Sequence, residues 1–133
     1  MYKYHEDGTQ PQNGEVFVFG SNLAGRHGAG AAKAALDYYG ARYGLGVGLV
    51  GNSYAIPTVT HTVRESMPLE EIAVYVKHFV AYTHYIAEWK PHLQFFVTRL
   101  GCVLAGYENK DIAPMFKGAI NCDFPEEWKE FLE

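Results

Sequence analysis

The sequence predicts an α/β protein in which helices pack against a largely parallel β-sheet. Two apolar segments of β type, Val16–Phe19 and Gln94–Leu100, have the near-continuous hydrophobicity of strands that are buried on both faces. Segments with helical spacing follow the first strand and precede the second. Because strands that alternate with helices are usually joined by crossovers, we expect neighbouring strands to run parallel.

The bulk composition fits one globular domain of 133 residues. Hydrophobic residues make up 48% of the chain and charged residues 20%, which argues against a disordered polypeptide. The net charge of −4 disfavours general nucleic-acid binding, which needs Lys and Arg against phosphates. The N-terminus is polar and no apolar run approaches the ~20 residues of a membrane span, so we expect a cytoplasmic protein that does not bind membranes.

Cysteine and histidine spacing gives no sign of a metal or a disulfide framework. Cys102 and Cys122 form no CxxC pair, and two free buried thiols are expected rather than a disulfide. The six histidines show no metal-ligand spacing. We therefore expect no metal site and no cofactor.

The N-terminal half is expected to contain two strands and one helix. Residues 1–15 are predicted to be a polar lead-in, with turns at Asp7-Gly8 and Asn13-Gly14. The helix after the first strand should run from Gly30 to Tyr39 and stop at Gly40. The glycine-rich residues 40–53 predict a shaped loop, Ser53–Ile56 a short strand ended by Pro57, and residues 58–65 a loop.

The longest helix is predicted from Pro68 to Trp89. Ser66 is a suitable N-cap, and two acidic residues in the first turn favour the positive end of the helix dipole. One buried face is indicated by residues at three–four spacing: Leu69, Ile72, Val76, Phe79, Val80 and Thr83.

After the second strand the chain should continue with short elements. These are a loop over residues 101–110, a short helix Asp111–Lys117, a strand Ala119–Cys122 and an amphipathic helix Pro125–Leu132.

The segment Gly20–Gly30 carries the strongest functional signal. Four glycines, at positions 20, 25, 28 and 30, lie between a buried strand and an alanine-rich helix. Glycine lets the backbone approach a ligand, and the free N–H groups at a helix start attract anions. The segment predicts binding of a phosphate or diphosphate that belongs to a nucleotide. The alternative is that the glycines only form a tight strand-to-helix turn.

Two common phosphate motifs are excluded by the residues present. Ala31 and Ala32 stand where a P-loop has lysine and Ser/Thr. Lys33 stands where the dinucleotide fingerprint has its third glycine, and no acidic residue follows about twenty positions on. The sequence therefore supports neither an ATPase nor a Rossmann dehydrogenase.

The polar side chains of the first loop have both ligand-binding and structural explanations. Asn22 suits a ribose hydroxyl, although Ser21 and Asn22 are also typical turn caps. Arg26 fits a solvated surface charge better than a phosphate partner, and His27 is the histidine best placed for function. A few tyrosines lie beside glycine loops where an adenine could stack, although core packing is the commoner role: Tyr43, Tyr54 and Tyr107.

Three segments resemble the macrodomain superfamily: FGSNLAGRHGAGAAKAA (19–35), NSYAIPT (52–58) and TRLGCVLAGYENKDIAPMF (98–116). The nearest branch includes a glycohydrolase that removes ADP-ribose from acidic side chains. The resemblance implies a single macrodomain-like domain over residues 1–133, a three-layer α/β/α sandwich that binds ADP-ribose or a related nucleotide. It assigns the ligand to two walls, one formed by Asn22, Gly28, Ala29 and Gly30, the other by Gly101, Cys102, Val103, Leu104, Ala105 and Gly106. Ser21 and Tyr107, which adjoin these walls in the sequence, are further candidate ligand-binding residues.

The sequence departs from that branch at its catalytic positions. Val59 stands in place of the lysine nucleophile and Ala105 in place of the acid/base aspartate, and HGAGAAK lacks the aspartate of other macrodomain hydrolases. His27 and Asp111 are the remaining acid/base candidates, although Asp111 also suits a helix cap. Three functions stay open: a nucleotide or ADP-ribosylated-protein binder, a glycohydrolase with a non-standard acid/base group, and a non-catalytic protein-interaction domain.

Overall fold

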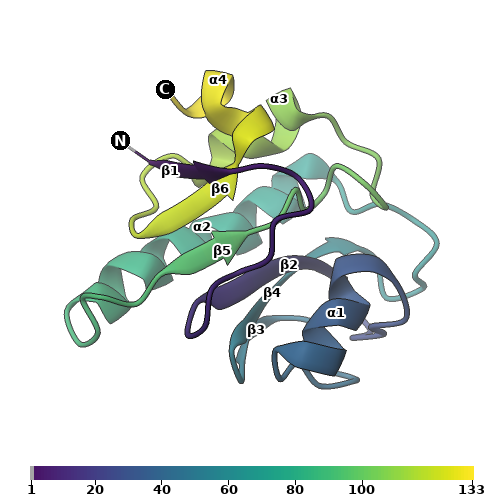
Figure 1. Cartoon of the computed structure of the whole chain (residues 1–133). Coiled ribbons are helices and arrows are strands. Elements are labelled where there is room, and N and C mark those ends of the chain that lie inside the picture. Colours follow the sequence, from purple (N-terminus) through teal and green to yellow (C-terminus); the bar gives the residue numbers. More distant parts are fainter. Residues whose placement is uncertain (1) are drawn as a thin grey trace.

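The computed structural model describes residues 2–133, and this part of the chain forms an α/β fold around one six-stranded sheet (Figure 1). The strand order is β1-β6-β5-β2-β4-β3, and all neighbours run parallel except β3 and β4. The strands are β1 (Lys3–His5), β2 (Val16–Asn22), β3 (Gly48–Val50), β4 (Ser53–Val59), β5 (Phe95–Val97) and β6 (Cys122–Pro125). The mostly parallel sheet confirms the expected fold class.

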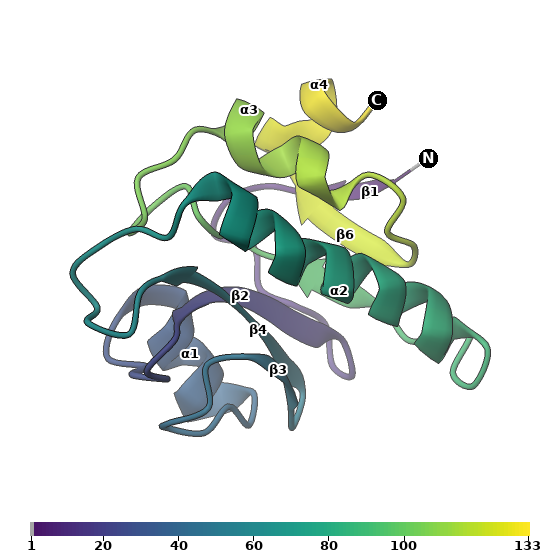
Figure 2. The same cartoon turned by 180° about the vertical axis from the view of Figure 1, so that it is seen from behind.

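Four α-helices and two 3-10 helices accompany the sheet in the described residues. They are α1 (Gly30–Tyr38), α2 (Leu69–Ala87), α3 (Asn109–Ile112), η1 (Ala113–Phe116), η2 (Glu126–Trp128) and α4 (Lys129–Leu132). Figures 1 and 2 show α1 on one side of the sheet and α2 running along the other. None of these helices combines the length and the apolarity needed to cross a membrane.

Strand β2 contributes side chains to both faces of the sheet. Val16 and Val18 belong to a large hydrophobic cluster with α2, whereas Phe17 and Phe19 belong to a smaller cluster with α1. This division follows from the strand period of two. Helix α2 buries four residues, Ile72, Val76, Phe79 and Thr83, so the predicted face is confirmed.

The larger cluster is anchored at the C-terminus by Trp128, which is fully buried. Its ring packs against Phe116 and Phe124, with centroids 5.2 and 6.1 Å away. Its indole N–H donates to Oδ1 of Asn109 at 3.0 Å, and the same oxygen accepts from Nε of Arg99 at 3.2 Å. Asn109 thereby ties the end of the chain to the segment that follows β5.

Two short edge strands were not expected from the sequence. Residues 1–15 were predicted to be a lead-in, but Lys3–His5 pairs with β6, and the glycine-rich residues 40–53 include β3, which pairs with β4. Each of these strands has only three residues, and none of the six is fully buried. Neither segment therefore shows the continuous apolar pattern by which a buried strand can be predicted. Helix α1, by contrast, lies where the sequence placed it.

The prediction that Pro57 ends its strand was wrong. Strand β4 continues to Val59, and Pro57 pairs in register with Ser21 of β2. Strand β3 pairs with β4 only as far as Ala55, so no strand lies opposite Pro57 on that side. The missing N–H of the proline therefore leaves no hydrogen bond of the sheet unmade there.

Several element ends also differ from expectation. Ser66 is not the N-cap of α2, because that position is Pro68 and the Ser66 hydroxyl donates to the Ala105 carbonyl instead. Strand β5 ends at Val97, and β6 begins only at Cys122. The two short C-terminal helices each divide into an α and a 3-10 part, as α3 with η1 and η2 with α4.

Replacing Asn109 by Ala should lower the free energy of unfolding by about 1–3 kcal/mol, because the buried indole N–H of Trp128 would lose its acceptor. Urea unfolding followed by Trp fluorescence measures the change. Lys110→Ala, at the exposed neighbouring position, is the control and should leave the unfolding midpoint unchanged. Equal midpoints for the two variants would contradict the role assigned to Asn109.

Candidate functional site

The first glycine loop, Gly20–Gly30, is held in place by its own side chains. The Asn22 amide closes the turn, donating to the Arg26 carbonyl at 2.8 Å and accepting from the Arg26 N–H at 2.9 Å. The buried Ser21 hydroxyl donates to the Gly46 carbonyl. Both candidate ligand-binding side chains are therefore occupied by structural bonds, while Arg26 itself is exposed.

The glycines of this loop divide into two groups. A Cβ at Gly25 would lie 2.3 Å from the Gly44 backbone, and one at Gly46 would lie 2.1 Å from the Asn22 carbonyl oxygen. These glycines permit the loop to pack against residues 44–46. In contrast, a Cβ at Gly28 or Gly30 would meet no atom within 4 Å. The backbone at these two positions is open to a ligand, and Ala29 between them is exposed.

His27, the first acid/base candidate, lies beneath the loop rather than on its surface. Its side chain is 1% exposed, and its Nε2 contacts the Leu45 carbonyl at 3.1 Å. Because a carbonyl only accepts, Nε2 is the donor in this contact. Nδ1 is buried and has no hydrogen-bond partner in residues 2–133. In this arrangement His27 fastens the loop to the segment around Leu45.

The second glycine loop, Leu100–Tyr107, is fixed at both ends and projects at its tip. The Tyr107 N–H donates to the Gly101 carbonyl at 2.9 Å, and its hydroxyl donates to the Met67 carbonyl at 2.5 Å. The Ala105 carbonyl accepts from Ser66. At the tip, Val103 and Leu104 are 77% and 78% exposed. A Cβ at Gly106 would meet no neighbour.

The two loops leave the same edge of the sheet, as Figures 1 and 2 both show. They begin side by side, because a Cβ at Gly20 would lie 3.2 Å from Cβ of Leu100. The buried Thr58 of β4 lies between them, 3.4 Å from that position and 3.7 Å from a Cβ at Gly101. That the loop tips line one cleft stays a prediction.

The positions that would carry catalysis are apolar or occupied. Val59 and Ala105 are both buried. Asp111 belongs to a capping box at the start of α3, where its carboxylate accepts from the Glu108 N–H at 3.1 Å. The described residues contain no group of three or more metal-ligating side chains. Of the two acid/base candidates, His27 is therefore buried and Asp111 has one carboxylate oxygen engaged in the helix cap.

The candidate tyrosines have three different environments. Tyr54 is buried in the core, and burial raises the pKa of its hydroxyl. Tyr43 is 64% exposed and precedes Gly44, whose N–H donates to the Gly25 carbonyl of the first loop at 2.8 Å. Tyr107 is half-buried, with its hydroxyl bound to Met67. Among the three, Tyr43 alone has a largely free ring.

Cys102 follows the first residues of the second loop and is half-buried, whereas Cys122 is buried in β6, and both are free thiols. Burial raises the pKa of the Cys102 thiol, and the positive charge of Arg99 opposes part of that rise. Burial also raises the pKa of Cys122. Both are therefore protonated at neutral pH, and Cys102 has no activated thiolate for nucleophilic chemistry.

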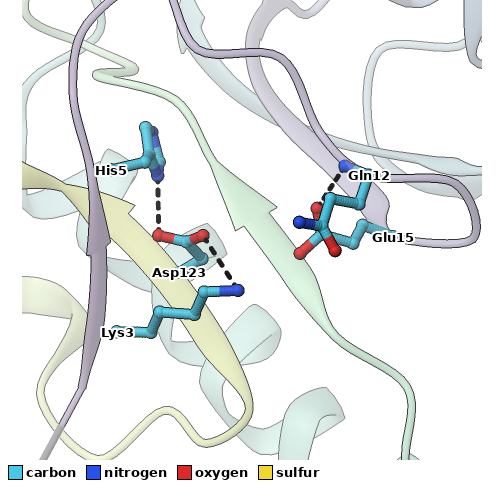
Figure 3. Close-up of polar contacts among 5 residues, drawn as sticks. All are labelled: Lys3, His5, Gln12, Glu15 and Asp123. Carbon is cyan, nitrogen blue, oxygen red and sulfur yellow. Dashed lines mark hydrogen bonds and ion pairs between the residues drawn. The ribbon is translucent and has the colours of Figure 1, made fainter.

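A cavity that no sequence motif indicated lies between α1 and the β1–β2 connection. It has a volume of about 620 Å³. The residues lining it include His5, Asp7, Phe17, Tyr38, Phe96 and Thr98. His5 contacts the buried carboxylate of Asp123, with Nδ1 2.8 Å from Oδ1, and Figure 3 shows this pair with Lys3 alongside. No motif links positions 5 and 123, so only the pairing of β1 with β6 could reveal the cluster.

Comparison with known proteins places the chain in no family. No family model, no curated protein sequence and no solved structure matches it.

Alkylation of Cys102 by iodoacetamide at pH 7.5 should be slower than that of an unstructured thiol, because its raised pKa keeps it protonated. The rate should increase as the pH rises above the usual thiol pKa of about 8.5. Mass spectrometry of the folded protein follows the reaction, and a Cys122→Ala variant isolates Cys102. A Cys102 rate that is already maximal at pH 7.5 would contradict the assigned environment.

Proposed function

We propose that the protein binds ADP-ribose or a related nucleotide diphosphate at the edge of the sheet where the two glycine loops begin. The single observation that carries the proposal is the free N-terminus of α1, flanked by two glycines with open backbone. The proposal rests on the chemistry of this edge together with the macrodomain resemblance of residues 19–35, 52–58 and 98–116.

The N-terminus of α1 has the properties of an anion site. The N-cap residue is Ala29, whose side chain cannot cap, and no acidic side chain lies in the first turn. The first N–H groups of α1 are therefore free to donate to a ligand, and the positive end of the helix dipole would attract a negative charge there. Gly28 and Gly30 leave space for close approach by a phosphate.

The second loop supports a second wall. Its ends are fixed by Tyr107 and Ser66, so a ligand would order only the tip and would cost little conformational entropy. The exposed Val103 and Leu104 would then cover the ligand and exclude water. In the proposed complex the diphosphate lies between this loop and the start of α1, in the three-layer sandwich of a macrodomain-like domain.

The residues at the loops favour binding over catalysis. Hydrolysis of an ADP-ribosyl bond needs a nucleophile or an acid/base group within reach of the ribose. Val59 and Ala105 supply neither, His27 is buried and Asp111 caps α3. The loop amides can still stabilise developing negative charge. We therefore propose a binding domain for free ADP-ribose or an ADP-ribosylated protein.

Replacing Gly28 by Val should abolish ADP-ribose binding and leave folding intact, because the added side chain meets no protein atom but fills the space proposed for phosphate. For the unmodified protein, ADP-ribose at a hundredfold excess over its dissociation constant should add about 2.7 kcal/mol. This corresponds to roughly 10 °C in melting temperature for a domain of this size. Isothermal titration of ADP-ribose, NAD and AMP measures affinity directly.

Gly25→Val is the matched control for steric effects within the same loop. Its side chain would collide with the Gly44 backbone, so this variant should lose stability even without ligand. If Gly28→Val binds ADP-ribose as the unmodified protein does, or if no nucleotide shifts the melting temperature, the proposed site is wrong.

Release of ADP-ribose from a glutamate-modified protein should be slow, because no acid/base group is presented to the ribose. Single-turnover assays compare the unmodified protein with Asp111→Asn and His27→Gln, which keep the size of each side chain. Rapid release that collapses in either variant would identify a hydrolase with its own acid/base group.

A further inference from the structure

The cavity between α1 and the β1–β2 connection is separate from the glycine loops. Its walls are residues 7–11 on one side and, on the other, Ala34 and Tyr38 of α1 with Tyr39 at the helix C-cap, and Phe17 and Phe96 of the sheet lie beneath. A volume of about 620 Å³ lies in the usual range for small-molecule sites.

Aromatic rings stand in a row across the base of this cavity. Tyr39 stacks on Phe17 with centroids 4.5 Å apart, and His5 stacks on Phe96 at 3.9 Å. Phe17 and Phe96 are register partners in β2 and β5, and their ring planes differ by only 13°. Phe17 and Phe96 are 6% and 3% exposed and support the row from beneath, so the accessible aromatic surface belongs to Tyr39 and His5 and suits a flat molecule.

The imidazole of His5 is fixed in one orientation at one end of the row. Asp123 is 5% exposed and its Oδ1 lies 2.8 Å from Nδ1 of His5, while Lys3 reaches the other oxygen at 3.7 Å. Figure 3 shows the imidazole above the carboxylate and the lysine beside it. A carboxylate partner on Nδ1 places the proton there and makes Nε2 of the neutral ring an acceptor.

The acceptor Nε2 is available to a ligand. Within residues 2–133 Nε2 of His5 makes no hydrogen bond and is not fully buried, so a molecule in the cavity that His5 lines can reach it. Charges of both signs surround the cavity, because Arg99 lines it together with Asp7, and Lys3 pairs with Asp123 behind the ring. The cavity therefore selects for neither an anion nor a cation and suits an uncharged ligand.

We infer that this cavity is a second binding site, for a small uncharged aromatic molecule that donates a hydrogen bond from an O–H or ring N–H to Nε2 of His5. The rings of Tyr38 and Tyr39, which line the cavity, contact the apolar body of the ligand. Asp123 acts as a positioning residue, because it fixes the tautomer and the orientation of the imidazole without contacting the ligand.

Phenol and toluene are matched probes for this inference, since they have nearly the same size and only phenol donates a hydrogen bond. Titration of each into nitrogen-15-labelled protein, followed by amide shifts of residues 5–11 and 34–39, gives both affinities. Phenol should bind at least tenfold more tightly than toluene, since a site with a polar acceptor rejects the analogue that lacks the donor.

His5→Asn separates ligand binding from the structural contribution of His5. The asparagine amide can still donate to Asp123 and hold β1 against β6, but it has no group in place of Nε2. The variant should keep its melting temperature and lose the tenfold preference for phenol. Lys3→Ala removes the exposed partner of Asp123, lies outside the cavity and should keep that preference.

A second measurement does not depend on the variant folding. In the unmodified protein, the nitrogen-15 resonance of Nε2 of His5 should shift on addition of phenol and not on addition of toluene. His92, which is exposed and lies outside the cavity, is the internal reference and should not shift. Equal affinities for the two probes, a phenol preference that survives in His5→Asn, or an unmoved Nε2 resonance would each overturn the inference.

Discussion

The structure depends on burial of both faces of β2. Val16, Phe17, Val18 and Phe19 are each at most 6% exposed, and alternate residues enter the two hydrophobic clusters. The strand pairs with β4 on one side and β5 on the other, so its position fixes both neighbours. It also fixes where the first glycine loop starts, because the strand ends at Asn22, whose side chain closes the turn.

The glycine content of the chain serves two physical purposes that composition does not separate. Gly25 and Gly46 are needed because backbones pass too close for any side chain. Gly28 faces open space, so packing within the protein does not require a glycine at this position. The first purpose stabilises the loop, and the second leaves the start of α1 accessible to a ligand.

The sequence predicted the parts of the fold that depend on local pattern. The buried strand β2, helix α1 and the apolar face of α2 each carry a periodic signal that extends over one or more turns or strand repeats. The loops were also placed at the right edge of the sheet, since Gly20 and Leu100 are in contact. The strand and helix patterns are encoded by residues that are close together in the chain, and the position of the loops follows from the parallel direction of β2 and β5.

What the sequence could not predict depends on distant pairing. Strand β1 has only three residues and is stable because β6 lies next to it. Pro57 would usually end a strand, and it is tolerated only because β3 stops at Ala55. The His5–Asp123 contact joins residues 118 positions apart, so no local motif precedes it. His27 looked like a loop side chain and is instead buried by residues 44–46.

The pairing of β1 with β6 also has a consequence for the order of folding. Residues 3–5 have no sheet partner until residues 122–125 have been added, so during synthesis the first strand waits for almost the whole chain. The rest of the sheet, β5-β2-β4-β3, is complete in sequence by Val97. Closing a connection of this length costs conformational entropy that three residue pairs repay only after β6 is in place. The edge formed by β1 can therefore join the sheet only after β6 has been made, and the cavity wall that follows β1 is completed at the same stage.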